Sequence, residues 1–126
     1  MKTHVAVMMV IVVAALGTRL GAHHGAAAYD MAATRTLEAT IVEFRWINPH
    51  ALIAFDATAE DRSVRRWTAE TAGLTILLRA GWTKSTLSSG MHVTMSGHPA
   101  RNGSATMILD HVVLDDGRVL SNFVPR

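Results

Sequence analysis

The sequence predicts a mainly β protein, a small OB-like β-barrel of five or six strands with one short helix. One observation is that segments with alternating apolar and polar residues recur between turn residues, which is the pattern of half-buried strands. The second is the order of the elements, because three strands, a short helix and then further strands is the order of an OB-type barrel. We therefore expect one closed or nearly closed barrel.

The first 22 residues have the layout of a signal peptide. Lys2 supplies the charged start, Val5 to Leu16 forms a twelve-residue apolar segment, and Gly21-Ala22 supplies small residues for cleavage. A transmembrane helix needs about 20 apolar residues, so this segment is short for one. We favour cleavage after Ala22 and a periplasmic or secreted protein. Cleavage after Ala28 and a retained N-terminal membrane anchor remain alternatives.

Charge and cysteine content narrow the class of function. Lys2 and Arg19 supply the whole formal charge of +2, so the chain from residue 23 onward has ten basic and ten acidic residues. A chain with balanced charge lacks the basic surface that nucleic acids require, and we expect no nucleic-acid partner. Without cysteine, the fold has no disulfide, no thiolate metal site and no cysteine nucleophile.

An arm precedes the first strands. Residues 23–35 are rich in small residues and are expected to be extended, and the barrel domain is expected to occupy residues 36–126. The alternation from Thr36 to Trp46 predicts the longest strand, which Asn48-Pro49 ends because proline removes a backbone donor. The second and third strands are predicted at residues 51–55 and 64–70.

The second half of the barrel begins with the helix. Leu74, Leu77 and Leu78 recur at helical spacing, with Thr71 expected to cap the start and Gly81 to end the helix. Two further strands are predicted at residues 91–95 and 106–114, and a brief last strand at 119–120 follows the Asp-Gly turn at 116–117.

The chain resembles a family of small exported bacterial proteins of unknown function. The shared features are a His-His start, Tyr-Asp, Phe-x-Trp-x-Asn-Pro-His, Trp-x-x-Glu-Thr, Gly-Trp-Thr, Leu-x-x-Gly, Gly-His-Pro-Ala and Asp-Gly. They lie here at residues 23–24, 29–30, 44–50, 67–71, 81–83, 87–90, 97–100 and 116–117. The family's Pro-Gly-Asp turn is replaced here by Ser88-Ser89-Gly90. The resemblance implies a secreted or periplasmic barrel and no established activity.

Metal binding is the most specific hypothesis for function. After cleavage at Ala22, His23 offers an α-amine and an imidazole that can chelate one ion, which no internal histidine can do. His24, His50 and His98 are the candidates for further imidazole ligands. Nitrogen-rich sites favour Cu(II), with Zn(II) less favoured. The sequence therefore predicts a copper site that resembles a histidine brace.

The alternatives to this copper site are structural. His23 and His24 could belong to a disordered arm, and His50 and His98 could each bond a backbone carbonyl beside a proline. Gly25 occupies the third position, where the common square-planar N-terminal copper motif has a histidine.

A ligand or partner surface is the second hypothesis, with Trp46, Asn48, Trp67 and Glu70 as its residues. In a domain this small, tryptophans are first expected in the core, together with Trp82, and Met91, Met95 and Met107 are expected there rather than on Cu(I). Glu70 could orient a metal-bound histidine or supply an oxygen ligand, but the favoured interpretation is that it caps the following helix. Asp30 is expected to pair with an arginine and so hold the arm against the barrel.

The sequence contains no catalytic signature. A nucleophile elbow, a phosphate-binding glycine loop and a His-Glu-x-x-His motif are all missing from it. The leading prediction is an exported binding module that handles copper. The alternative is a metal-free accessory barrel that binds a partner protein or a small apolar ligand.

Overall fold

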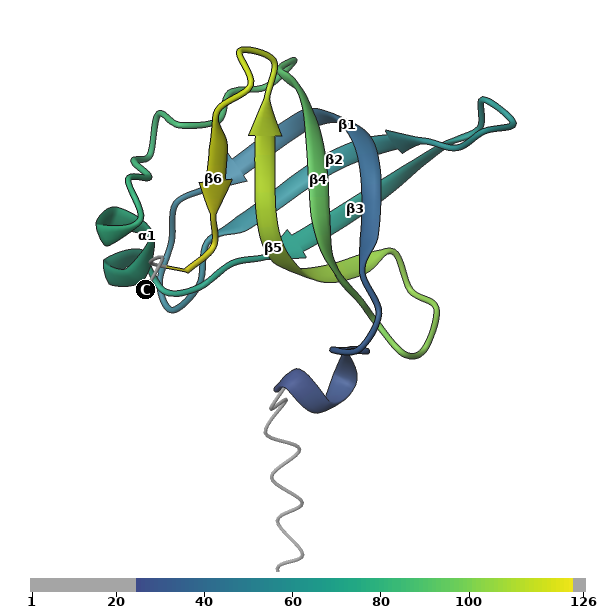
Figure 1. Cartoon of the computed structure of the whole chain (residues 1–126), viewed down its shortest axis with the longest axis horizontal. Helices are drawn as coiled ribbons and strands as arrows, with labels where there is room; N and C mark the ends of the chain where they lie inside the picture. Colours follow the sequence, from purple (N-terminus) through teal and green to yellow (C-terminus); the bar gives the residue numbers. More distant parts are fainter. Residues whose placement is uncertain (1–24, 124–126) are drawn as a thin grey trace, which may run out of the picture.

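Six strands form one curved sheet in the computed structural model of the chain, which describes residues 25–123 (Figure 1). A short 3-10 helix, η1 (Ala26–Ala28), precedes the strands. The other elements are β1 (Arg35–Arg45), β2 (Leu52–Thr58), β3 (Val64–Glu70), α1 (Leu74–Arg79), β4 (His92–Pro99), β5 (Thr106–Leu114) and β6 (Val119–Ser121).

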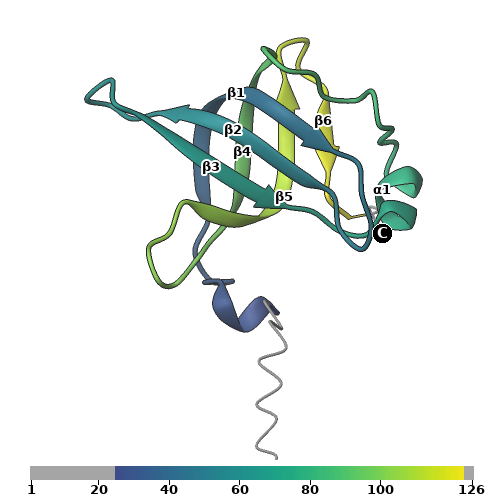
Figure 2. The ribbon, with the colours of Figure 1, turned by 180° about the vertical axis from the view of Figure 1, so that it is seen from behind.

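The sheet closes into a five-stranded barrel. Its strand order is β3-β2-β1-β4-β5-β6, with neighbouring strands antiparallel, and a parallel pairing of β3 with β5 joins the two ends. β6 lies outside the closed ring as an extra strand on β5. The predicted mainly β, OB-like barrel with one short helix is confirmed. Figure 2 shows the opposite side, where the β2–β3 hairpin projects from the barrel.

The barrel interior holds the core because alternate residues of each strand point inward. Phe55 and Trp67 stack there, with ring centroids 6.4 Å apart and an angle of 18° between the rings. Trp82, which follows α1, is 0% exposed, and its indole N–H donates to the backbone oxygen of Ser121. Met95 and Met107 are also fully buried, which agrees with their predicted core role. Each such large side chain contributes about 1.5–3 kcal/mol through burial.

Gly97 allows two strands to approach closely at the end of the barrel. A Cβ atom at this position would collide with the backbone oxygen of Ile108 and would lie 2.8 Å from the sulfur of Met107. The pairing of β4 with β5 also shifts register between Ser96 and Gly97. Only glycine leaves room for this close approach of β4 and β5. The approach sets the direction of the loop at residues 100–105.

The predicted cap of α1 is wrong. The N-cap is Gly73, and it has no side-chain cap hydrogen bond. Thr71 is instead buried, and its hydroxyl lies within hydrogen-bond distance of the backbone oxygens of Ala51 and Ala72. Glu70 precedes the N-cap by three residues, so it does not cap the helix either. At the other end, Gly81 has a φ of 90° and ends the helix as predicted.

The described part of the arm is extended at Gly25 and Tyr29 and contains one short turn between them. η1 forms one turn, and Tyr29 then makes an isolated antiparallel bridge with Ala100. Its backbone is held further by a bond from Asp30 N to Pro99 O and one from Arg101 N to Ala28 O. The predicted pairing of Asp30 with an arginine is confirmed, since its carboxylate lies 3.9 Å from Arg101.

The end of the described chain is fixed by one buried side chain. Asn122 is 1% exposed, and its amide oxygen accepts from the backbone N–H of Ala72 at 2.6 Å. Its amide nitrogen donates to the backbone oxygen of Leu109 at 2.8 Å. Asn122 therefore ties the start of α1 to β5.

We expect Asn122→Ala to lower the free energy of unfolding by about 2–4 kcal/mol, because a buried N–H and a buried carbonyl both lose their partner. Chemical denaturation measures this loss. Asn102→Ala is the matched control, since Asn102 is exposed and makes one local bond to Ser104 N; it should cost less than about 1 kcal/mol. An equal loss in both variants would contradict this account of Asn122.

Candidate functional site

Two neighbouring cavities lie where β3 ends, and Glu70 lines both of them. Strand alternation turns Trp67 and Ala69 into the barrel and Glu70 outward, so its carboxylate stands on the outer face. The arm, the β1–β2 loop and the β4–β5 loop border this face. In OB-type barrels the same face between these two loops binds ligands. We therefore take the surroundings of Glu70 as the candidate site.

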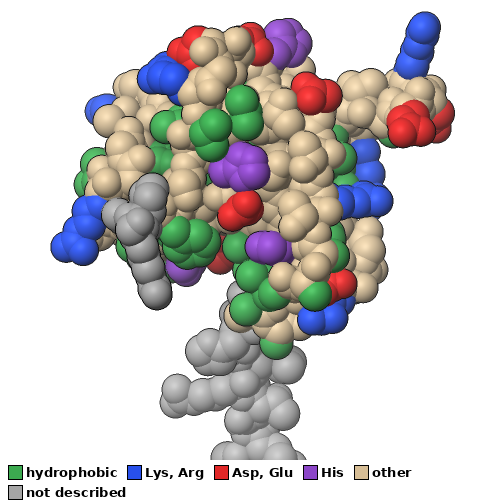
Figure 3. Space-filling view, viewed as in Figure 1, with side chains coloured by type: hydrophobic (Ala, Val, Ile, Leu, Met, Phe, Trp, Pro, Cys, Tyr) green, Lys and Arg blue, Asp and Glu red, His purple; other side chains and the backbone are tan. Residues whose placement is uncertain are grey.

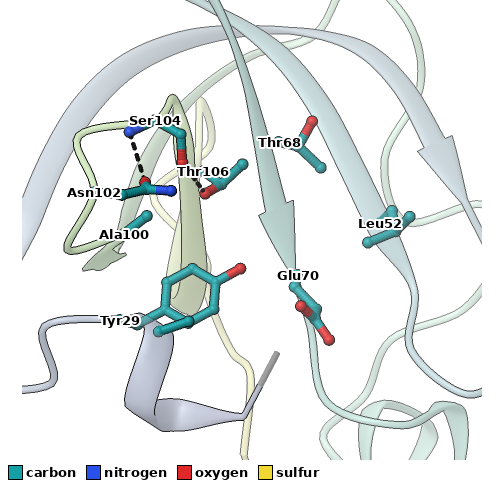
Figure 4. Close-up of a pocket in the computed structure, with 9 residues that line it drawn as sticks. Tyr29, Leu52, Thr68, Glu70, Ala100, Asn102, Ser104 and Thr106 are labelled. Atoms are coloured by element: carbon teal, nitrogen blue, oxygen red, sulfur yellow. Dashed lines mark hydrogen bonds between the residues drawn. The ribbon is translucent and has the colours of Figure 1, made fainter. Parts of the chain in front are cut away.

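The first cavity, of about 320 Å³, contains Tyr29 and is lined by both apolar and polar side chains (Figure 4). The phenol hydroxyl of Tyr29 points toward the space between Glu70 and Thr106. Across it, the Thr106 hydroxyl lies 3.0 Å from that of Ser104. The pKa of Tyr29 is raised, first because burial disfavours the phenolate and then because Glu70 adds negative charge; Thr106 opposes the rise.

The second cavity, of about 350 Å³, holds His50 on the opposite side of Glu70 from Tyr29. His50 Nε2 lies 4.0 Å from Glu70 Oε1, which is too long for a hydrogen bond. Both side chains are partly exposed to solvent. Gly25, the first described residue, lines this cavity as well, and Ile76 and Phe123 give it an apolar wall.

Of the two predicted metal ligands within the described residues, His50 lines a cavity at Glu70 and His98 does not. His50 shares its cavity with Glu70, whereas His23 and His24 lie outside the described residues. His98 lies on β4, and its Nδ1 donates to the backbone oxygen of Ala33 at 2.8 Å because a carbonyl can only accept. A bond to a backbone carbonyl beside a proline was the alternative to metal binding for His98. The contact uses Nδ1 and leaves Nε2 as the free ring atom. Within residues 25–123, no three histidine or carboxylate side chains form a ready metal-binding group.

The predicted ligand surface is divided in the structure. Asn48 is exposed in the β1–β2 loop, where the Asn48-Pro49 peptide bond is cis. Trp46 is partly buried and packs edge-on against Phe44, at 5.7 Å between ring centroids. Trp67 is only 4% exposed, so its ring belongs to the core. Of these residues, Glu70 alone lines the cavities described above.

Two further histidines among the described residues lie on the sheet. His92 is exposed and bonds the Thr40 hydroxyl, and His111 is paired with its neighbour Asp110 at 2.8 Å. Figure 3 shows the face toward the viewer of Figure 1, where histidine, acidic and hydrophobic side chains are mixed and the basic side chains lie around the rim. No single charge dominates this face.

Sequence reasoning missed the cavity around Tyr29. Tyr29 is the only tyrosine of the chain, and it was placed in an extended arm without a contact. Asn102, Ser104 and Thr106 complete the cavity from the β4–β5 loop and the start of β5. Two features of the sequence could have pointed to this cavity: the polar composition of residues 101–106 and the single tyrosine of the Tyr-Asp motif. Neither feature could show that the arm folds back onto this loop.

Comparisons with known proteins add a family and no activity. A sequence model described as a family of unknown function (DUF6152) matches residues 10–109. No curated protein and no solved structure matched the chain. None of the helices in the described part of the chain has the length and hydrophobicity needed to cross a membrane.

We expect the phenol of Tyr29 to titrate above its ordinary pKa of about 10. A raised pKa means that the folded state favours the neutral phenol. Its contribution to stability is therefore present below the unfolded pKa and is lost as the pH rises through the folded one. Because the chain has one tyrosine, the ultraviolet absorbance of phenolate reports this group alone. Glu70→Gln should lower the Tyr29 pKa, and Glu38→Gln, remote from this cavity, should not. A phenol that titrates identically in wild type and Glu70→Gln would contradict the assigned contact.

Proposed function

Because the chain belongs to a family of unknown function (DUF6152), we propose its function from the site itself: an exported binding module that binds copper through a mature N-terminal histidine. In this proposal residues 1–22 are a signal peptide, the protein is periplasmic or secreted, and His23 is its first residue. His23 then supplies its α-amine and its imidazole. His50 supplies a third nitrogen, and Glu70 supplies an oxygen ligand or orients His50.

One observation carries the proposal: Gly25 lines the same cavity as His50 and Glu70. Consecutive Cα atoms are about 3.8 Å apart, so the Cα of His23 is within about 7.6 Å of the Cα of Gly25. The first residue of the proposed mature chain is therefore tethered within reach of this cavity. The short distance to Gly25 and the partly apolar wall of the cavity together favour metal chelation by His23 in this cavity over an N-terminus that makes no contact with the barrel.

The distance between His50 and Glu70 also suits a metal ion. Ligand atoms that each lie about 2.0–2.2 Å from one ion are about 2.9–4.2 Å apart, depending on the angle between the bonds. The 4.0 Å between His50 Nε2 and Glu70 Oε1 falls within this range. Two nitrogens from His23, one from His50 and a carboxylate form a nitrogen-rich set, which favours Cu(II) over Zn(II). His24 and His98 are the candidates for additional ligands.

The metal-free alternative has its own observation. Ile76, Leu78 and Phe123 are large hydrophobic side chains that are 40–57% exposed, and two of them line the His50 cavity. An apolar ligand or a partner protein could cover them. In that function Trp46 and Asn48 belong to the contact surface and copper plays no part.

We expect the mature protein to begin at His23 and to bind Cu(II) about a hundredfold more tightly than the variant His23→Ala, a difference of about 2.8 kcal/mol. The substitution keeps the α-amine but removes the imidazole that chelates the ion with it. Intact mass of the exported protein fixes the first residue, and competitive titration against a copper chelator measures affinity. A mature chain that begins at Tyr29, or equal affinity in both forms, would overturn the proposal.

The barrel side of the site is tested by separate variants. His50→Ala should weaken Cu(II) binding about 10- to 100-fold and change the copper electron paramagnetic resonance spectrum, because a nitrogen ligand is lost. Glu70→Gln should weaken it less and leave the nitrogen hyperfine pattern in place. His92→Ala is the matched control, since His92 is exposed on β4 and lines neither cavity at Glu70. An unchanged spectrum in His50→Ala would place the ion elsewhere.

A further inference from the structure

We infer that the opposite side of the β4–β5 loop binds a small tetrahedral oxyanion, the phosphate or sulfate group of a small molecule. A third cavity, of about 320 Å³, lies where β3 diverges from β5 before the two strands pair. Three arginines line it: Arg35 from β1, Arg65 from β3 and Arg101 from the loop. Glu70 and His50 do not line this cavity, so the inference is independent of the copper proposal.

The floor of the cavity orients two of these arginines. The guanidinium carbons of Arg35 and Arg65 lie 5.7 Å and 5.6 Å from the ring centre of Trp67. Both distances are within the range of cation–π contact. A guanidinium that lies over an aromatic ring keeps the N–H groups along its edge free to donate. Trp67, a core residue, thereby holds the two cations in place at the mouth of the barrel.

The positive charge of the cavity is poorly compensated by the protein. In the described part of the chain, neither Arg35 nor Arg65 lies within ion-pair distance of a carboxylate. Arg65 donates only to the backbone oxygen of Gly103, at 3.3 Å. Arg101 has one carboxylate partner, Asp30, at the long distance of 3.9 Å. Like charges gathered in one cavity repel one another, and a bound anion removes that cost.

The arrangement selects the chemistry of the ligand. Three guanidinium groups approach from three different elements, and each can donate to one or two oxygens. A tetrahedral dianion offers oxygens in several directions and two charges, whereas a carboxylate offers two oxygens and one charge. The volume lies at the low end for small-molecule sites. A polyanion needs an extended basic surface, whereas these three arginines are gathered in one cavity.

To test this inference, the exported protein is titrated in chloride buffer with inorganic phosphate, sulfate and acetate. Backbone amide shifts locate the site, and calorimetry measures affinity. We expect phosphate and sulfate to bind in a saturable way and to shift residues around Trp67 and the loop at 100–105, with acetate at least about tenfold weaker. Absence of saturation, shifts confined to another surface, or binding of an oligonucleotide without binding of phosphate would each overturn the inference.

Two variants with opposite expected effects on phosphate affinity separate a change in binding from a loss of folding. Arg101→Gln should weaken phosphate binding about tenfold, and folding is not at risk because this side chain is 59% exposed. Asp30→Asn should strengthen phosphate binding, because it removes the competing carboxylate. Arg45→Gln is the matched control, since Arg45 is exposed at the other end of the strand that carries Arg35. Equal affinity in Arg101→Gln and Arg45→Gln would exclude the site.

Discussion

The parallel pairing of β3 with β5 is the contact on which the rest of the structure depends. It joins the two ends of the sheet through Thr68 with Thr106, Ala69 with Met107, and Glu70 with Ile108. The pairing involves only Thr68 to Glu70, so the earlier part of β3 diverges from β5. Glu70 stands outward at one end, where the chain turns toward α1, and Arg65 lies near the other end, where the strands diverge. The closure thus creates the cavities on both sides of the β4–β5 loop.

Strand alternation then determines the charge of each cavity. Along β3, Arg65 and Trp67 line the cavity that holds the three arginines, whereas Thr68 and Glu70 line the cavity that contains Tyr29. The Trp67 ring covers the flat faces of the Arg35 and Arg65 guanidinium groups. Their N–H edges are therefore exposed at the mouth of the barrel. The carboxylate of Glu70 meets His50 and Tyr29 on the outer face because both flanking loops converge there. Two sites of opposite charge therefore arise from one strand.

The sequence was sufficient for the fold because strands and turns are local features. The alternation from Thr36 to Trp46 predicted β1 to within one residue at each end, and the Asp-Gly turn predicted Gly117, whose φ is 84°. The prediction that Thr71 caps α1 was wrong because Thr71 makes tertiary hydrogen bonds instead. Both its N–H and its hydroxyl donate to the backbone oxygen of Ala51. The candidate sites depend on closure in the same way. Arg35, Arg65 and Arg101 are far apart along the chain, as are His50 and Glu70, and no periodicity reports that they meet.

The arm has a physical role that follows from how it is anchored. Tyr29 is buried, its backbone pairs with Ala100, and Asp30 is held by Pro99 and by Arg101. Ordering the backbone of a residue costs about 1–2 kcal/mol, so a free arm of eight residues would oppose metal binding by more than a single ligand bond contributes. Because folding has already ordered the arm from Gly25 onward, the residues between Gly25 and the barrel add no further ordering cost to metal binding. The anchoring of Tyr29 and Asp30 therefore makes an N-terminal chelate on this barrel energetically reasonable.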